Sequence, residues 1–370
     1  MPRAAERTTV VAPAPPGKHP ARRAHVNELG DTLSYTANAI HLAERPTGYP
    51  DASTWELKSK ELPELEDGQL LVATEYISVD PAMRGWLDDT PSYVPPVNVG
   101  AVMRALAVGR VVESKNDDFP VGAHVHGTLG VRDYLVTDGK DLRVIDTSQV
   151  SGPEHLAALG LTGLTAYFGL MELGKPTEGE TVLVSGAAGA VGSVVGQLAK
   201  IAGARVIGIA GSDEKCEWLT DELGFDEAVN YKTADSLTKA IATAAPNGVD
   251  VFFDNVGGRI LDAALANTAR NARLVICGAI SDYNSTDRAG IRNYPRIITH
   301  SLTIHGFTIG DFGDRLPEGM KALGGYLAEG KLVSRIDARD AEVKDFPEVF
   351  SALFEGTNTG KLIMALPGRE

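Results

Sequence analysis

The sequence is poor in cysteine, with Cys216 and Cys277 the two present among 370 residues. Two cysteines cannot form a disulfide framework or a four-cysteine zinc site, and we interpret them as reduced thiols of a cytoplasmic protein. No apolar run reaches the roughly 20 residues that a membrane-spanning helix needs. Residues 1–26 also lack the apolar stretch of a secretory signal. We therefore expect neither a disulfide-rich secreted protein nor a membrane protein.

Positive charge is also in short supply, because 35 Lys and Arg residues stand against 49 Asp and Glu residues, a net charge of −14. Such an acidic surface disfavours nucleic acids and anionic membranes as partners, although it allows a local basic pocket for a phosphate. Hydrophobic residues make up 43% of the chain, enough for a sizeable core. At about 150 residues per domain, the length predicts two domains.

The residue pattern changes between the two halves of the chain, and together the two patterns predict an α/β protein. Up to about residue 163, short β-prone segments such as 69–77 and 107–112 are separated by Gly and Pro. From about residue 178, apolar runs alternate with helical segments, which is typical of βαβ units and a parallel sheet. The runs cover 181–185, 205–210, 251–254, 273–276 and 302–305, and the helical segments cover 190–202 and 213–223. A closing strand is expected at 361–365.

A glycine-rich turn follows the first apolar run. It has the pattern G-x-G-x-x-G with Ala187 in place of the first glycine. Gly189 allows the backbone to approach a pyrophosphate, and Gly192 permits close packing of helix on strand. The helix that begins with Ala190 and Val191 points its N–H groups at that anion. The strand–turn–helix context favours a dinucleotide site over a turn that is merely close-packed.

The end of the second apolar run indicates which dinucleotide is bound. NAD enzymes place Asp or Glu there, on the ribose 2′-hydroxyl, whereas this chain has Gly211 and Ser212. Lys215 follows one turn later and offers a cation for a 2′-phosphate. A solvated helix lysine is the alternative, but the combination favours NADP(H).

Metal ligands are scarce in the β-prone half. His124 and His126 form an H-x-H pair without a third ligand, and both cysteines lie in the other half. Zinc requires three or four such ligands. We therefore predict no metal and interpret the pair as ordinary strand histidines.

Several short motifs in order resemble the zinc-independent branch of the medium-chain dehydrogenase/reductase family, which includes prostaglandin, curcumin and alkenal double-bond reductases. The resemblance covers roughly residues 38–366. It is carried by the segments 76–81, 111–114, 161–167, 211–215, 254–258, 277–281, 283–284 and 358–361. Two departures, at Ala82 and at Val131 or Arg132, replace aromatic residues that relatives often carry and leave the substrate open.

The resemblance implies a two-domain fold. A GroES-like β-rich catalytic domain would comprise residues 31–164 and 311–370, and a Rossmann domain with a doubly wound parallel sheet would comprise 165–310. Residues 1–30 would form a mobile N-terminal tail. Relatives are commonly dimers, and the strand near 302–307 offers an edge for a homodimer.

The implied activity is NADPH-dependent reduction of a C=C bond in an α,β-unsaturated carbonyl compound. Hydride addition to the β-carbon places negative charge on the carbonyl oxygen, which needs a hydrogen-bond donor. Tyr283 is our predicted donor, and a tyrosine that merely anchors its own loop is the alternative. Besides the four residues of the glycine-rich turn, the motif matches assign the cofactor to Gly211, Ser212, Lys215, Tyr231, Asn255, Cys277, Gly278, Ala279, Ile280, Ser281, Phe307, Thr308, Ile309 and Asn358. A quinone oxidoreductase and an NADPH-binding sensor without turnover remain open.

Overall fold

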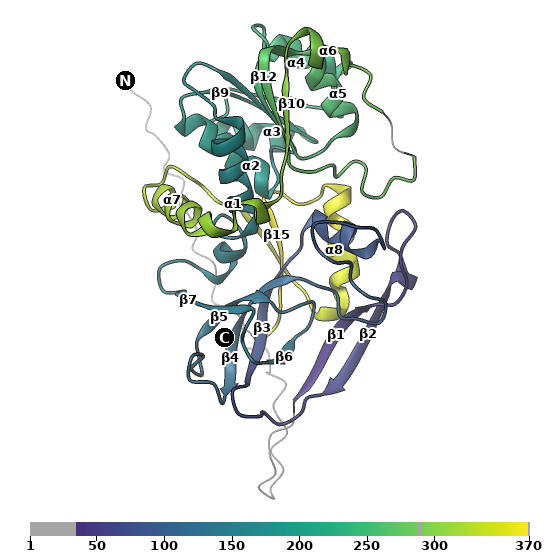
Figure 1. Cartoon of the computed structure of the whole chain (residues 1–370), viewed down its shortest axis with the longest axis vertical. Helices are drawn as coiled ribbons and strands as arrows, with labels where there is room; N and C mark the ends of the chain where they lie inside the picture. The colour runs from purple at the N-terminus through teal and green to yellow at the C-terminus, as the bar shows by residue number, and fades with distance from the viewer. Residues whose placement is uncertain (1–34, 288–289, 369–370) are drawn as a thin grey trace, which may run out of the picture.

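The computed structural model describes residues 35–287 and 290–368, and the predicted mobile tail lies outside them. Two sheets dominate the chain (Figure 1). In Figure 1 a mostly antiparallel sheet occupies the lower half, and a parallel sheet with its helices occupies the upper half. The predicted combination of a β-rich domain with a Rossmann-like parallel sheet is confirmed.

The lower sheet has the strand order β14-β15-β3-β4-β5-β7, with β6 paired to β3, while β1 and β2 form a separate hairpin. Helix α8, Phe346–Glu355, buries its apolar side in the core under this sheet. Strand β15 comes from the end of the chain and pairs antiparallel with β3, as expected for a closing strand. The strands are β1 Thr36–Leu42, β2 Trp55–Glu61, β3 Leu70–Ser78, β4 Leu106–Ser114, β5 His124–Thr128, β6 Tyr134–Thr137, β7 Leu142–Ile145, β14 Ile336–Asp340 and β15 Lys361–Ala365.

The upper sheet has the order β10-β9-β8-β11-β12-β13 with every pairing parallel. The chain reverses direction across the sheet between β8 and β11, and ligands of such sheets bind beyond the carboxyl ends of the strands at this point. The strands are β8 Thr181–Ser185, β9 Arg205–Ala210, β10 Glu227–Asn230, β11 Val249–Asp254, β12 Thr268–Ile276 and β13 Thr303–Gly306.

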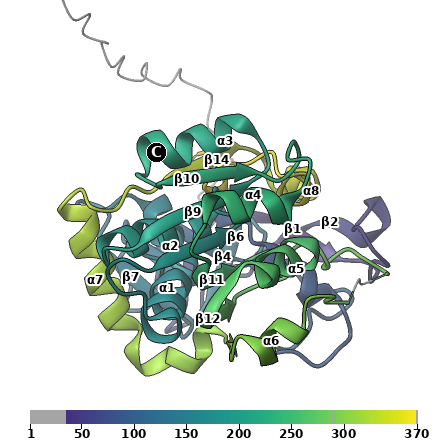
Figure 2. The same cartoon turned by 90° about the horizontal axis from the view of Figure 1, so that it is seen from above.

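Helices cover both faces of the parallel sheet (Figure 2). Successive side chains of β8 alternate between two cores: Val182 and Val184 join the core under α1, α2 and α7, and Leu183 joins the core under α4 and α5. This explains why the centre of the first predicted run, Val182 to Val184, is apolar at successive positions. The helices are α1 Leu161–Phe168, α2 Ala190–Ile201, α3 Asp213–Glu217, α4 Leu237–Ala244, α5 Gly258–Ala266, α6 Pro295–Thr299 and α7 Leu316–Ala328.

The local predictions differ from the structure at several points, among them helices α4 and α5, which the sequence did not indicate. The helix expected over 213–223 is divided, because α3 continues as a π-helical turn over Trp218–Glu222. Strand β10 was not foreseen. Helix α7 packs against α1 and the core of the parallel sheet, although we assigned its residues to the catalytic domain, so the exact domain boundaries stay a prediction.

Within the described residues, none of the helices combines the length and apolar character needed to cross a lipid bilayer.

Candidate active site

The glycine-rich turn lies between β8 and α2. Gly189 is the N-cap residue of α2, and no described side chain caps that helix, so the first N–H groups of this twelve-residue helix are available to an anion. A Cβ atom at Gly192 would come within 2.4 Å of the Gly186 carbonyl oxygen, so this position requires glycine. The turn therefore fits the pyrophosphate of a dinucleotide.

A buried polar network supports this turn from β11. The Ser185 hydroxyl donates to the Asp254 carboxylate at 2.6 Å, and the Asn255 side-chain amide donates to the Ser185 carbonyl oxygen at 2.7 Å. The same carboxylate accepts backbone N–H groups of Val256 and Gly257. Burial raises the pKa of Asp254, although these hydrogen bonds oppose the shift. The network fixes the end of β8 against the end of β11, which places Asn255 beside the turn.

Two lysines meet where β9 and β10 end. Ser212 caps α3 by accepting the Lys215 backbone N–H, and the Lys215 ammonium donates to the Gly356 carbonyl oxygen at 2.8 Å. Burial lowers the pKa of Lys215, and the nearby Lys232 ammonium lowers it further. Two adjacent cations in an acidic protein favour an anionic ligand such as a 2′-phosphate.

The Tyr231 side chain also lies where β9 and β10 end. The Tyr231 ring packs against Gly211, where an added Cβ atom would lie 3.1 Å from the ring. The Arg259 guanidinium lies 5.3 Å from the centre of the same ring, within cation–π range. The structure therefore brings Tyr231 against Gly211 at the end of β9, and their roles toward a phosphate stay a prediction.

The loop after β12 contains the predicted Cys277–Ser281 segment and Tyr283. The Ala279 backbone N–H donates to the Tyr283 hydroxyl oxygen at 3.2 Å, which leaves the phenol's own hydrogen available to donate. Burial raises the pKa of Tyr283, with Cys277 and Tyr93 contributing. Burial also raises the pKa of the Cys277 thiol to about 12. Both groups are therefore neutral at pH 7.

Two further segments reach the same edge of the sheet. Phe307, Thr308 and Ile309 follow β13, and the Phe307 ring packs edge-on against Phe253 of β11. From the other domain, the Gly360 backbone N–H donates to the Ala188 carbonyl oxygen at 2.8 Å. This bond brings the loop with Asn358 against the glycine-rich turn.

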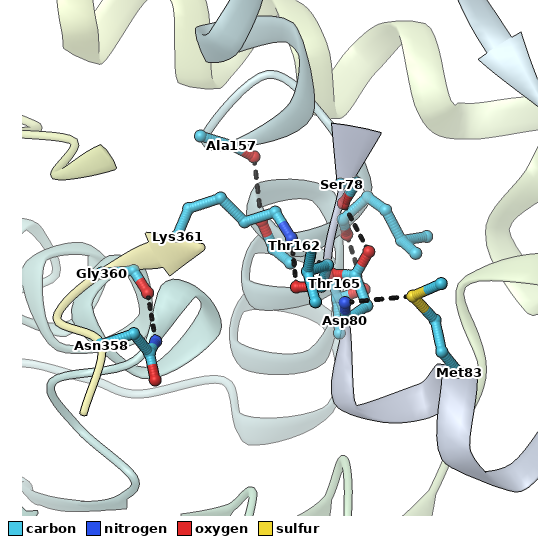
Figure 3. Close-up of polar contacts among 11 residues, drawn as sticks. Ser78, Asp80, Met83, Ala157, Thr162, Thr165, Asn358, Gly360 and Lys361 are labelled. Carbon is cyan, nitrogen blue, oxygen red and sulfur yellow. Dashed lines mark hydrogen bonds and ion pairs between the residues drawn. The ribbon is translucent and has the colours of Figure 1, made fainter. Parts of the chain in front are cut away.

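A buried ion pair anchors that returning loop (Figure 3). The Lys361 side chain points toward Asp80, and the ammonium donates to the Asp80 carboxylate at 2.7 Å and to the Val79 carbonyl oxygen at 3.0 Å. The Ser78 hydroxyl also donates to the carboxylate. The Lys361 and Asp80 side chains are 2% and 9% exposed. The pair therefore fixes the start of β15 to the end of β3.

Within residues 35–287 and 290–368, no three His, Cys, Asp or Glu side chains are grouped so as to hold a metal ion. His124 instead contacts Glu75 and Thr147.

Comparisons with known proteins agree with this geometry. Family models match at residues 38–145, described as the N-terminal domain of oxidoreductase, and at residues 190–324, described as zinc-binding dehydrogenase. The chain is 47% identical to YfmJ of Bacillus subtilis (strain 168), over 90% of this chain and 98% of that protein. It is 38% identical to the NADPH-dependent curcumin reductase of Escherichia coli (strain K12), over 88% and 96% of the two chains. It is 41% identical to prostaglandin reductase 1 of Bos taurus, over 89% and 98%.

A solved structure leads to the same class. The crystal structure of CurA from Vibrio vulnificus in complex with NADPH superposes with a TM-score of 0.84 at 36% identity, covering 89% of this chain and 99% of that one. The fold and the site therefore define a dinucleotide-dependent oxidoreductase. The chain belongs to the zinc-independent medium-chain dehydrogenase/reductase family, together with curcumin, prostaglandin and alkenal reductases. This confirms the predicted family, enzyme class and NADP(H) cofactor.

Some residues of the site were not predicted. Lys232 stands next to Tyr231 in the sequence, and its charge beside a predicted phosphate position was an available signal. The Asp80–Lys361 pair joins residues 281 positions apart; both residues lie in segments that carry the resemblance, but neither segment indicates that the two side chains meet.

Proposed function

We propose that this enzyme reduces the C=C bond of α,β-unsaturated aldehydes and ketones. The observation that carries the proposal is the half-buried, neutral Tyr283 phenol in the loop beyond β12, with its hydrogen free to donate. Relatives named curcumin reductase, prostaglandin reductase 1 and, from Nicotiana tabacum, 2-alkenal reductase support the same substrate class.

Different residues of the site would bind the cofactor and stabilise the reacting substrate. The turn from Gly189 to Gly192 would hold the pyrophosphate, and Lys215 with Tyr231 the 2′-phosphate. Asn255, the 277–281 and 307–309 segments and Asn358 would line the ribose and nicotinamide. When bound, NADPH supplies the hydride that adds to the β-carbon of the substrate. Tyr283 donates a hydrogen bond to the carbonyl oxygen as enolate charge develops there, and the α-carbon then takes a proton from solvent or through this hydroxyl.

Steady-state NADPH oxidation with a panel of an alkenal, an aryl enone, a quinone and a saturated aldehyde tests the proposal. We expect turnover of the alkenal and enone, with the saturated carbonyl compound as product. Quinone turnover alone would favour a quinone oxidoreductase, and NADPH binding without any turnover would favour a sensor.

The Tyr283→Phe variant tests the donor. Loss of one donor to a developing oxyanion costs about 10²–10³ in kcat, and we expect a fall of this size with little change in NADPH affinity. Tyr326→Phe is the matched control, because that tyrosine lies in α7, which packs against α1. Unchanged turnover of enones by Tyr283→Phe would remove the phenol from the mechanism.

We also propose a homodimer formed through β13, the edge strand of the parallel sheet. Exposed apolar side chains gather in the sequence around this edge, since Tyr294, Ile298 and Ile304 are 60%, 77% and 43% exposed. Edge pairing would cover unpaired backbone groups and these side chains together. Sedimentation should show a dimer that Ile304→Arg dissociates, and a monomeric native chain would contradict it. The cytoplasmic location stays a prediction.

A further inference from the structure

Arg84 lies on the catalytic-domain side of the site, in the 3-10 helix Pro81–Leu87, and is 3% exposed. Its guanidinium connects three separate segments. Nε and Nη2 donate to the Gly48 carbonyl oxygen at 3.1 and 2.9 Å, and Nη1 donates to the Asp88 carboxylate at 2.8 Å. Nε also donates to the Asn284 side-chain oxygen at 3.0 Å. This last bond crosses from the catalytic domain to the loop after β12.

Asn284 directly follows Tyr283, so a contact that fixes Asn284 restricts where Tyr283 can lie. The side-chain nitrogen of Asn284 is buried and has no hydrogen-bond partner among the described residues. The bond to Arg84 is therefore the contact that orients this amide. On the other side of the phenol, the hydroxyl oxygen is held by the Ala279 N–H.

We propose that Arg84 is a positioning residue that acts through Asn284 to hold Tyr283 against the substrate. The proposal rests on the role given to Tyr283 above. A guanidinium suits this task because its planar fork can bind the loop carbonyl at Gly48 and the Asn284 amide at the same time. The Gly48 loop and the Pro81–Leu87 helix of one domain thereby set the position of the donor carried by the other.

Arg84 is itself buried among polar partners, so its replacement endangers folding, and Asn284 is the better position to change. Asn284→Ala removes the acceptor for Arg84. We expect kcat with an enone to fall about 10- to 100-fold, because small displacements of a positioned group have effects of this order, while the KM for NADPH stays within about threefold. Arg45→Ala is the matched control. Arg45 donates to the Leu87 carbonyl oxygen at the end of the same 3-10 helix and makes no contact with Asn284 in the described structure.

A double-mutant cycle separates positioning from general damage. If Asn284 acts through Tyr283, adding Asn284→Ala to Tyr283→Phe should lower kcat by less than about twofold. Multiplicative losses in the double variant, or an unchanged kcat in Asn284→Ala, would overturn the proposal. An unchanged kcat in Tyr283→Phe would overturn it as well.

Amide hydrogen exchange of residues 277–287 is a second measurement, and it does not depend on turnover. The amides of this loop should exchange faster in Asn284→Ala than in the native chain. They should not do so in Asn284→Asp, which keeps an acceptor for Arg84. Failure of the native enzyme to reduce any enone would refute the proposed function, and this exchange experiment would still decide whether the loop is held as proposed. Equal exchange in all three proteins would overturn the positioning role.

Discussion

Replacement of Lys215 by alanine should weaken the binding of NADPH far more than that of NADH. The Lys215 ammonium lies between α3 and the Gly356 carbonyl oxygen, with Lys232 nearby. One of its three N–H groups is used by that carbonyl oxygen, so the others are available for a phosphate. Burial lowers the pKa of Lys215, yet an ordinary lysine starts near 10.4, so we expect the ammonium form at neutral pH.

The magnitude follows from the kind of contact. A hydrogen bond to a charged group contributes about 1.5–3 kcal/mol. Because Lys215 is partly solvated and Lys232 remains as a second cation, we take the lower half of this range, about 1.5–2 kcal/mol. At about 1.4 kcal/mol per factor of ten, the dissociation constant of NADPH should rise about 10- to 30-fold.

NADH provides the internal reference. It lacks the 2′-phosphate, but it depends on the same contact between Lys215 and Gly356, so any general loosening of this corner affects both nucleotides. The assay compares dissociation constants of the two nucleotides by fluorescence titration, with Lys331→Ala as control, since Lys331 pairs with Glu329 beyond the end of α7. Equal weakening of NADPH and NADH binding would refute the phosphate role.

Two further predictions concern stability. Lys361→Met leaves the Asp80 carboxylate buried without its cation and should cost about 3–5 kcal/mol of unfolding free energy, whereas the double variant with Asp80→Asn should recover much of it; a double variant no more stable than the single one would contradict the pairing. Burial lowers the pKa of His126 to about 4, so the unfolded chain takes up a proton first as the pH falls below about 6.5. Urea unfolding should therefore show a loss of about 2 kcal/mol between pH 7 and pH 5 that is absent in His126→Leu, and equal losses in both proteins would exclude His126 as the cause.

The parallel sheet could be predicted because its strands are buried on both faces. The centre of a strand such as β8, Val182 to Val184, is then apolar at successive positions, and the glycine-rich turn marks where the strand ends. Strand β10 gave no such signal, since its four residues include Glu227 and Asn230 and its exposure is mixed. The reason is that a separate core packs on each face of β8, whereas β10 lies at the edge of the sheet.

The candidate site was predictable where one rule of topology sufficed. Residues that follow parallel strands meet at one edge of the sheet, which supports the assignment of Tyr283, whereas Asn255 and Phe307 were assigned from the resemblance. The same rule says nothing about the departure at Val131 or Arg132. Val131 is fully buried in the core of the antiparallel sheet, where its side chain contributes to packing, and the effect of this departure on the substrate stays a prediction.

Contacts between distant segments determine the rest of the site. The bond from Gly360 to Ala188, the ion pair of Lys361 with Asp80 and the bond from Arg84 to Asn284 join residues roughly 170 to 280 positions apart. Gly360 must be glycine, because its φ is +75° and an added Cβ atom would lie 2.1 Å from the Arg335 carbonyl oxygen. The parallel sheet thus provides the cofactor edge, and the returning chain end holds the catalytic domain against it. It follows that substitutions that loosen β15 should alter NADPH affinity even though they lie outside the Rossmann sheet.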